Sequence, residues 1–451
     1  MRIVFGVHQF FPKYTTGTEV HTLDLAREMR RRGHEVMIVT HQRTHAAVDT
    51  AHDAIERYRY DDFPVYAIVD VPPLSWEATG SAYDSRVSAE RFAALMHELA
   101  PDLVHFTHVM RLGIGALRAL LRTGVPYVVT LTDFFALCPR IILMDRAGRL
   151  CDGPLFNDCI WCMTGSRVLP LHSIALPEDA AAMYTETLNV EGLAVAEEQR
   201  AAGQRYHLLR YYLAGASKLI APTRFLHEMF VRNGYAAEWL LYSPFAVDED
   251  QLADHAHQPS ATSVRIGFLG SVTEHKGPHV LIEAFRRLPR EDARLEIWGE
   301  MPDPVYAERI RGLAGDDPRI TLHGRFAPKD QPDILARLDV MVVPSLWHEN
   351  TPLVLCAAVH AGIPVVGSNV GGVTELVTDE ENGLVYPAGN VVALHNALRR
   401  LIEDPALRSR LRGHRRTFPT AREQGTVLEA VYRAAIATNT AKKSYDRSER
   451  R

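Results

Sequence analysis

The sequence predicts an α/β protein made of two doubly wound, Rossmann-like domains that face a central cleft. Short β-branched runs alternate with helical patterns in both halves of the chain, which is typical of βα units around a mainly parallel sheet. An aperiodic polar stretch, Val247–Ser263, separates the two halves and is the predicted linker. With 451 residues, 47% of them hydrophobic, the chain is long enough to bury two cores.

The first predicted domain spans residues 1–247. Apolar residues recur at helical spacing within Thr18–Arg32, and Gly33 ends that helix before the next strand. Pro101 and Pro126 stand directly before two strands, where a proline ends the preceding helix without disturbing the ladder. The strands of this domain are expected at Arg2–Val7, Val36–Thr40, Val65–Val69, Leu103–Phe106, Tyr127–Thr130 and Leu219–Ala221.

Two segments are expected to extend this first domain. Residues 177–213 are rich in Ala, Glu, Gln and Arg without strand-like alternation, which predicts a helical insertion. Residues 138–162 carry four of the five cysteines. Both segments are predicted to shape the pocket for a substrate.

The second predicted domain, residues 264–420, repeats the alternation. A C-terminal helix over 421–437 is expected to return to the first domain, followed by a disordered tail over 438–451. Because ligands of open α/β sheets bind beyond the carboxyl ends of the strands, the loops after these strands are the candidate sites. The strands are expected at Arg265–Leu269, Leu295–Trp298, Ile320–His323, Val340–Val343 and Val365–Ser368.

Composition excludes several classes of function. The formal net charge of -5 comes from interspersed acids and bases, so no nucleic-acid partner is predicted. Met1–Phe11 is too short for the apolar core of a signal peptide, and no apolar run approaches the roughly 18 residues that span a bilayer. A cytoplasmic protein is therefore expected. The arginines 30–32 leave open a peripheral contact with an anionic membrane, although such a run more often forms a solvated helix end.

Two strand-to-helix junctions carry residues suited to an anion. The segment Thr16–Glu19 begins the first helix, and its glycine lets a ligand approach the backbone. The alternative is a capping box of Thr16 and Glu19, which explains the pattern without a ligand. Gly270–Gly277 places Lys276 before a helix that begins at Pro278, where the free amides of a helix start meet a cation. A solvated lysine is the ordinary alternative there.

A third junction, Pro344–Pro352, combines a carboxylate with a helix start. Thr351 is the predicted N-cap and Pro352 the first helical residue, which leaves the amides of Leu353 and Val354 open to an acceptor. Gly371 and Gly372 follow the next strand and add a flexible turn. A carboxylate beside a helix start suits a sugar that bears hydroxyls and a diphosphate, and the alternative is a surface loop with an incidental acid.

Three ordered motifs in the second half give the chain a family resemblance. G-S-V-T-E-H-K-G-P-H-V-L-I-E-A-F, P-S-L-W-H-E-N-T-P-L-V-L and A-G-I-P-V-V-G-S-N-V-G-G-V-T-E-L-V follow the order and spacing of the donor site in the family 4 retaining glycosyltransferases of the GT-B fold. The first half is similar more loosely, through G-T-E, R-R-G-H-E-V and P-D-L-V-H-F. T-D-F-F-A-L-C-P-R resembles a branch of the family with a cysteine-bearing segment.

The resemblance implies transfer of a sugar from a nucleotide-diphosphate sugar to a hydroxyl acceptor, without a catalytic divalent ion. Lys276 would hold the diphosphate, Glu349 would contact the donor sugar, Glu375 would cap the helix after Gly371 and Gly372, and Asp133 is a candidate for orienting the acceptor. The predicted catalytic residues are Lys276, Glu349 and Asp133. The predicted donor site comprises Gly17, Gly270, Ser271, Lys276, Arg325, Glu349, Asn350, Thr351, Leu353, Gly371 and Gly372.

Three positions depart from the family pattern. Ser271 stands where an arginine is usual, Ala357 where a second glutamate usually contacts the ribose, and Thr132 where a histidine is common. Loss of the arginine removes a charge-assisted hydrogen bond worth roughly 1.5–3 kcal/mol, which Lys276, His275 or Arg325 would replace in part. A differently held nucleotide is expected.

The four clustered cysteines, Cys138, Cys151, Cys159 and Cys162, follow the spacing C-x12-C-x7-C-x2-C. The close pair Cys159 and Cys162 is of the kind that binds zinc, so a structural zinc site is predicted, with buried thiols or an iron–sulfur cluster as alternatives.

Other functions are left open by these residues. The departures at Ser271, Ala357 and Thr132 also fit a non-catalytic partner subunit or a sugar-binding protein of the same fold. A phosphorylase or epimerase on this fold remains an alternative. A Rossmann dehydrogenase is excluded because Gly113-Ile114-Gly115 is not a G-x-G-x-x-G turn after a strand. The identity of the sugar, the base and the acceptor, and the oligomeric state, do not follow from the sequence.

Overall fold

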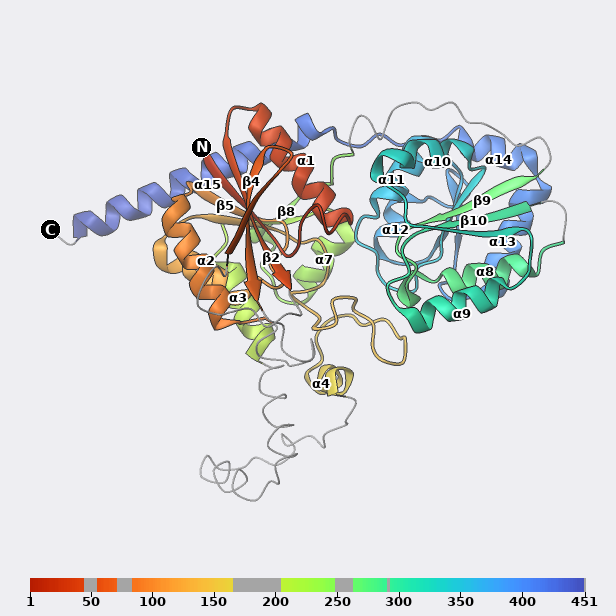
Figure 1. The fold of residues 1–451 in the computed structure, drawn as a ribbon, viewed down its shortest axis with the longest axis horizontal. Coiled ribbons are helices and arrows are strands. Elements are labelled where there is room, and N and C mark those ends of the chain that lie inside the picture. The colour runs from red at the N-terminus through yellow and green to blue at the C-terminus, as the bar shows by residue number, and fades with distance from the viewer. Residues whose placement is uncertain (44–54, 71–82, 165–203, 248–262, 290–292, 450–451) are drawn as a thin grey trace, which may run out of the picture. The chain divides into compact units, whose positions relative to one another are not determined.

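The computed structural model describes residues 1–43, 55–70, 83–164, 204–247, 263–289 and 293–449 (Figure 1). The chain forms two compact units. The first, called the N-terminal unit, comprises Met1–Ala221, His227–Ser243 and Gly425–Arg451, and the second, the C-terminal unit, comprises Pro222–Leu226 and Pro244–Gln424. Most of the predicted linker, and of the predicted helical insertion, lies outside the described residues, but residues 204–214 are helical.

The N-terminal unit contains an eight-stranded sheet in the order β3-β4-β2-β1-β5-β6-β7-β8, parallel except for the pair of β3 and β4. The predicted strands are all present. The hairpin of β3 and β4 was not predicted, although Asp61 and Asp62 carry its signal: their φ values of 49° and 61° fit the type I′ turn that joins antiparallel strands. The strands are β1 Arg2–Val7, β2 Glu35–Arg43, β3 Ile55–Tyr60, β4 Phe63–Asp70, β5 Leu103–Phe106, β6 Tyr127–Thr130, β7 Lys218–Ala221 and β8 Leu240–Tyr242.

Helices cover this sheet, and two of them share its core (Figure 1). Leu25 and Met29 of α1 pack with Leu428 and Tyr432 of α15 against buried residues of β1 and β2. Of the arginines considered for a membrane, Arg31 and Arg32 form ion pairs with Glu28. The named helices are α1 Gly17–Arg31, α2 Arg86–Leu99, α3 Gly113–Thr123, α4 Phe156–Thr164, α7 Arg224–Arg232, η2 Ala237–Trp239 and α15 Ala421–Glu449.

The C-terminal helix is longer than the sequence predicts. A helix over 421–437 with a disordered tail over 438–451 was expected, whereas α15 continues to Glu449. After Gly425 the sequence holds no glycine or proline, and Ala and Lys, which favour helices, are frequent in it. No residue therefore interrupts the helix at the predicted boundary.

The C-terminal unit is a six-stranded parallel sheet in the order β11-β10-β9-β12-β13-β14. The expectation of two doubly wound α/β units is confirmed. Because β9 and β12 are neighbours and parallel, the loops that follow them leave the same edge side by side. The strands are β9 Val264–Leu269, β10 Ala293–Trp298, β11 Ile320–Gly324, β12 Val340–Val343, β13 Val365–Ser368 and β14 Gly383–Tyr386. The helices are η3 Glu274–Lys276, α8 Pro278–Arg286, α9 Pro304–Ala314, η4 Pro328–Asp330, α10 Gln331–Arg337, α11 Leu353–His360, α12 Gly371–Leu376, α13 Val391–Glu403 and α14 Pro405–Arg412.

Candidate functional site

The loops after β9 and β12 bring Lys276 and Glu349 into direct contact. The Lys276 ammonium donates to both carboxylate oxygens of Glu349, at 2.7 and 2.8 Å. The amide of Leu346 also donates to the carbonyl of His275 at 2.8 Å, which fixes one loop against the other. The two residues that the sequence singled out therefore form one cluster at the carboxyl edge of the sheet.

Two further side chains complete the hydrogen bonding of Glu349. Ser345 Oγ donates to Oε1 at 2.5 Å and Trp347 Nε1 at 2.9 Å. The Lys276 ammonium also lies 5.0 Å from the centre of the Trp347 ring, within the range of a cation–π contact. We call Lys276, Ser345, Trp347 and Glu349 the lysine–glutamate cluster.

The electrostatics of the cluster keep Glu349 charged. Glu349 is 3% exposed, and burial by itself raises the pKa of a carboxylate. Lys276, with the hydrogen bonds from Ser345 and Trp347, outweighs burial and holds the pKa of Glu349 below its ordinary 4.5. At neutral pH the cluster is a buried ion pair with a partly accessible ammonium.

Two glycines allow the loops to pack this closely. A Cβ on Gly277, whose φ is +69°, would lie 2.0 Å from the carbonyl oxygen of Pro344. A Cβ on Gly372 would lie 1.7 Å from the carbonyl oxygen of Asn350, and the Gly372 amide donates to the Glu349 carbonyl at 2.8 Å. Gly372 thus holds the backbone of Glu349 in place through the loop after β13.

The start of α11 differs from the prediction by one residue. Thr351 was expected to be the N-cap and Pro352 the first helical residue, but α11 begins at Leu353 and Pro352 is the N-cap, without a side-chain capping bond. The reason is that the Pro352 carbonyl is the first to accept a helical bond, from Leu355. The amides of Leu353 and Val354 remain in the first turn, where no intrahelical acceptor exists.

Glu375 also has a different role from the expected one. It was expected to cap the helix after Gly371 and Gly372, but its carboxylate accepts from the amides of Arg224 and Phe225 at the start of α7. Asn350 likewise engages this segment, through a 3.1 Å bond between its Oδ1 and Thr223 Oγ1. Carboxylate and other polar side chains accept hydrogen bonds from the backbone amides at the start of a helix, and the first turn of α7 provides such amides.

The remaining predicted donor residues of this unit do not join the lysine–glutamate cluster. Gly270 ends β9 with its amide bonded to the Trp298 carbonyl at 3.0 Å, and Ser271 after it is exposed. Arg325 follows β11, which is separated from β9 by β10, and lies 3.6 Å from Glu300. Ala357, in place of the family's second glutamate, is 1% exposed within α11.

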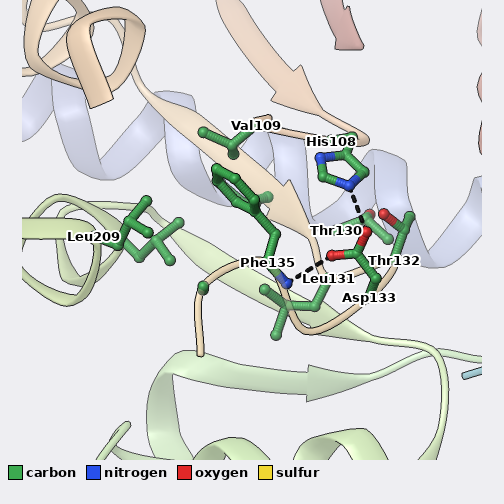
Figure 2. Close-up of a pocket in the computed structure, with 11 residues that line it drawn as sticks. His108, Val109, Thr130, Leu131, Thr132, Asp133, Phe135 and Leu209 are labelled. Atoms are coloured by element: carbon green, nitrogen blue, oxygen red, sulfur yellow. Dashed lines mark hydrogen bonds and ion pairs between the residues drawn. The ribbon is translucent and has the colours of Figure 1, made fainter. Parts of the chain in front are cut away.

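In the N-terminal unit, Asp133 is paired with a histidine that the sequence reasoning missed. His108 Nε2 lies 2.7 Å from Asp133 Oδ2, and the Phe135 amide donates to Oδ1 at 2.7 Å (Figure 2). His108 follows β5 and Asp133 follows β6, the neighbouring strand, so a histidine directly after a buried strand was the available signal. Thr132, beside Asp133, has an Oγ1 without a hydrogen-bond partner.

Beside His108 lies a second pair, His8 and Glu19. The rings of His8 and His108 are 4.4 Å apart, and His8 Nε2 is 3.7 Å from Glu19 Oε1. Glu19 Oε2 accepts from the amide and the hydroxyl of Thr16, at 2.7 and 2.5 Å, so the capping box considered for the start of α1 is confirmed. Gly17 is the first residue of that helix.

The structure does not show the predicted zinc site. Cys138 and Cys162 are buried, Cys151 and Cys159 are partly exposed, and all are free thiols. Within the described residues, which include these four, no three or more His, Cys, Asp or Glu side chains are grouped so that they can hold a metal ion. Burial raises the pKa of Cys159 to about 12 and that of Cys151 to about 11, so both are protonated at neutral pH.

Two sequence families match the chain in the two halves where these clusters lie. The profile of "Glycosyltransferase Family 4" matches residues 15–149, and that of "Glycosyl transferases group 1" matches residues 251–417. Together with the fold, these matches decide the family. The chain belongs to family 4 of the GT-B glycosyltransferases. This glycosyltransferase has no helix, among those that the structure describes, with the length and apolar run needed to cross a bilayer.

Individual relatives of this glycosyltransferase are distant. It is 26% identical over 417 residues to the D-inositol 3-phosphate glycosyltransferase of Xylanimonas cellulosilytica, covering 88% of this chain and 85% of the relative. It is 27% identical over 242 residues to the 2-deoxystreptamine glucosyltransferase of Streptomyces kanamyceticus, covering 49% and 62%. The solved structure of Anabaena Alr3699/HepE in complex with UDP and glucose has the same fold, with a TM-score of 0.59 and 18% identity over 99% of each chain.

Proposed function

We propose that this glycosyltransferase is a retaining, hexosyltransferase-type enzyme that uses a nucleotide-diphosphate sugar, held by its C-terminal unit, and a hydroxyl acceptor. The observation that carries the proposal is the contact of Lys276 with Glu349 at the carboxyl edge of a parallel sheet. A partly accessible ammonium, bound to a glutamate in the loop that leads into α11, is chemically suited to a diphosphate. The complex of Alr3699/HepE with UDP and glucose supports this choice of donor.

In the proposed mechanism the protein positions the reactants and stabilises the leaving group. The bond between the anomeric carbon and the diphosphate oxygen breaks, and the acceptor oxygen bonds to that carbon on the same face. The proton of the acceptor hydroxyl passes to the departing diphosphate oxygen, so no protein nucleophile is required. Lys276 neutralises the negative charge that develops on the departing diphosphate. Such electrostatic stabilisation by a fixed cation lowers the barrier of the reaction.

Glu349 is proposed to act through the position of its oxygens. Its Oε1 already accepts three hydrogen bonds, from Lys276, Ser345 and Trp347, while Oε2 accepts only from Lys276. A carboxylate oxygen has room for a further donor, so Oε2 is the atom proposed to receive a hydroxyl of the donor sugar. Asp133, fixed by His108 and the Phe135 amide, is proposed to accept a hydrogen bond from the acceptor.

The departures from the family pattern favour one alternative function, that of a non-catalytic partner subunit. Ser271 carries no charge and Ala357 is buried without a polar group, so two usual contacts to the nucleotide are missing. A non-catalytic partner subunit that binds a sugar nucleotide without turnover would have these features. Donor turnover distinguishes the two functions.

The test is release of nucleoside diphosphate from a panel of UDP, GDP and ADP sugars. We expect slow hydrolysis of at least one sugar nucleotide, and a loss of at least about 100-fold in Lys276→Ala, because a charge-assisted contact to the leaving group contributes about 3 kcal/mol. Lys329→Ala, at an exposed lysine of the same unit, is the matched control and should behave like wild type. With an acceptor found, NMR of the anomeric proton reports retention or inversion.

The results that would contradict the proposal are equally specific. Turnover of none of the sugar nucleotides by the wild type, with or without acceptors, favours the partner subunit. Equal turnover by Lys276→Ala and wild type removes the lysine–glutamate cluster from the mechanism. An inverted anomeric product leaves the glycosyltransferase intact but rejects the retaining mechanism.

A further inference from the structure

The lysine–glutamate cluster of the unbound protein directs its positive charge to one carboxylate. The Lys276 ammonium has three N–H donors, and it donates to both carboxylate oxygens of Glu349, at 2.7 and 2.8 Å. Glu349 is charged at neutral pH, because its pKa lies below 4.5 although burial alone would raise it. A ligand that approaches the ammonium therefore meets an ion pair instead of a free cation.

A diphosphate that binds Lys276 comes into competition with this carboxylate. Both groups are anions, and both are stabilised by the same ammonium. Like charges a few ångströms apart repel each other strongly where water screens them little. Ser271 carries no charge, so the loop Gly270–Gly277 offers Lys276 and His275 as its only cationic groups to offset the repulsion. The ion pair of the unbound protein thus opposes the binding of a diphosphate.

A sugar attached to the diphosphate changes this balance. Ser345 and Trp347 donate to Oε1 of Glu349 besides the lysine, whereas Lys276 is the one donor to Oε2 among the described residues. A sugar hydroxyl that donates to Oε2 replaces the lysine at that atom, and one N–H of the ammonium turns to the diphosphate. Glu349 keeps its position, because two neutral donors remain on Oε1.

Trp347 is suited to hold both members of the ion pair during this exchange. Its Nε1 donates to Glu349 Oε1 at 2.9 Å, and the Lys276 ammonium lies 5.0 Å from the centre of its ring. A ring face attracts the charge of an ammonium and not a particular N–H, so the contact persists while the N–H groups change acceptors. The His275 ring meets the Trp347 ring edge-on at 5.0 Å, which keeps the indole between the two loops.

We infer that Glu349 and a diphosphate compete for Lys276, and that a sugar hydroxyl on Oε2 of Glu349 ends this competition. Ser345 and Trp347 are positioning residues that hold the carboxylate when the lysine turns to the diphosphate. After the sugar has been transferred, the lysine donates to Oε2 again and the nucleoside diphosphate is released. The inference rests on the proposed function in placing the donor at Lys276 and Glu349, and it concerns the affinities for donor and product.

The experiment is titration calorimetry of the full chain with UDP and with UDP-glucose, followed by the corresponding GDP and ADP pairs if the uridine nucleotides do not bind. We expect wild type to bind the sugar nucleotide at least about tenfold more tightly than the nucleoside diphosphate, the equivalent of one charge-assisted hydrogen bond. Glu349→Gln removes the competing charge, so the nucleoside diphosphate should bind at least about fivefold more tightly. The preference for the sugar nucleotide should shrink to within about threefold.

Glu274→Gln is the matched control for the change in charge. Glu274 lies in the same loop as Lys276, but its carboxylate is 3.1 Å from Arg309. The variant loses the same charge from an exposed ion pair, so both affinities should stay within about twofold of wild type. Equal tightening of the nucleoside diphosphate by the two variants would assign the effect to the overall charge and reject competition at Lys276.

Trp347→Phe tests the positioning residue and protects the test if Glu349→Gln fails to fold. Phenylalanine keeps a ring face for Lys276 but lacks the N–H, so Glu349 depends more on the lysine. We expect the nucleoside diphosphate to bind about threefold more weakly, and the sugar nucleotide to lose less because its hydroxyl supplies a donor. In the Glu349→Gln background the loss should disappear. A merely structural defect would weaken both ligands alike and persist in that background.

Several outcomes would overturn the inference. It fails if wild type binds the nucleoside diphosphate as tightly as the sugar nucleotide, if Glu349→Gln does not tighten the nucleoside diphosphate, or if no nucleotide binds. It also fails if Trp347→Phe weakens both ligands equally. Turnover is measured separately. The expected affinities without turnover reject the transferase and keep the inference, whereas turnover with equal affinities rejects the inference and keeps the transferase.

Discussion

The two polar clusters of the molecule differ in how completely their buried groups are hydrogen-bonded. Glu349 accepts four hydrogen bonds from three side chains, although it is 3% exposed. Glu19, at 0% exposed, has donors on Oε2 alone, and neighbouring His8 Nδ1 has no partner. The lysine–glutamate cluster is complete within the protein, whereas the histidine–carboxylate cluster, made of His8, Glu19, His108 and Asp133, keeps two buried polar atoms without a hydrogen-bond partner.

This difference assigns the two clusters different contributions to stability and binding. A saturated buried ion pair is held rigidly, and removing one partner strands a charge. An unsaturated cluster costs free energy in the unbound protein and recovers it when a ligand donates hydrogen bonds. The same substitution, glutamate to glutamine, should therefore lower stability more in the lysine–glutamate cluster than in the histidine–carboxylate cluster.

The largest expected effect is that of Lys276→Met. It leaves the Glu349 carboxylate buried beside a neutral side chain, and breaking a buried pair in this way costs about 3 kcal/mol. Hydrogen-exchange mass spectrometry of peptides from 340–360 measures the local loss of protection. Combining Lys276→Met with Glu349→Gln removes both charges and should restore most of the loss. An equal loss in the single and double variants would show that no charge is stranded.

A smaller effect, with a defined pH dependence, is expected for Glu349→Gln. The folded-state pKa of Glu349 lies below its ordinary 4.5, so the carboxylate stabilises the fold above that pH and loses this contribution as the pH falls. We expect the variant to be about 2 kcal/mol less stable than wild type at pH 7. Calorimetric melting from pH 7 down to pH 3.5 should show the difference shrinking below pH 4.5. A difference independent of pH would mean that shape, not charge, causes it.

The sequence predicts the parts of the site that depend on local order along the chain. Lys276 and Glu349 each lie in a motif between a strand and a helix, and the parallel sheet places both motifs at one edge. The contact between them, across 73 residues, depends on how two loops pack, and Ser345 and Trp347 acquire their role only through that packing. The confirmed capping box of Thr16 and Glu19 is local in the same sense.

The contacts within the histidine–carboxylate cluster could not be predicted from the sequence, for a physical reason. His8 and His108 are brought together by the pairing of β1 with β5, and no local pattern encodes which strands become neighbours. Glu375 was misread for the same reason, because the helix start that it caps, at Arg224, is distant in the sequence. The zinc site predicted from the cysteine spacing stays a prediction, because no group of three or more ligating side chains is found within the described residues.

The smallest expected effect is that of Glu19→Gln, which repeats the Glu349→Gln change in the unsaturated cluster. The amide oxygen of glutamine can accept both bonds from Thr16. Its NH2 group then faces His8 Nε2, which can accept from it when the neutral ring carries its hydrogen on Nδ1. Removing a buried charge that lacks full compensation is neutral or stabilising, so we expect stability within about 0.5 kcal/mol of wild type or above it. Calorimetric melting at pH 7, beside Glu349→Gln, measures both. If Glu19→Gln were as destabilising as Glu349→Gln, the Glu19 charge would be compensated within the protein, as a protonated His8 would do. The comparison between the two clusters would then be wrong.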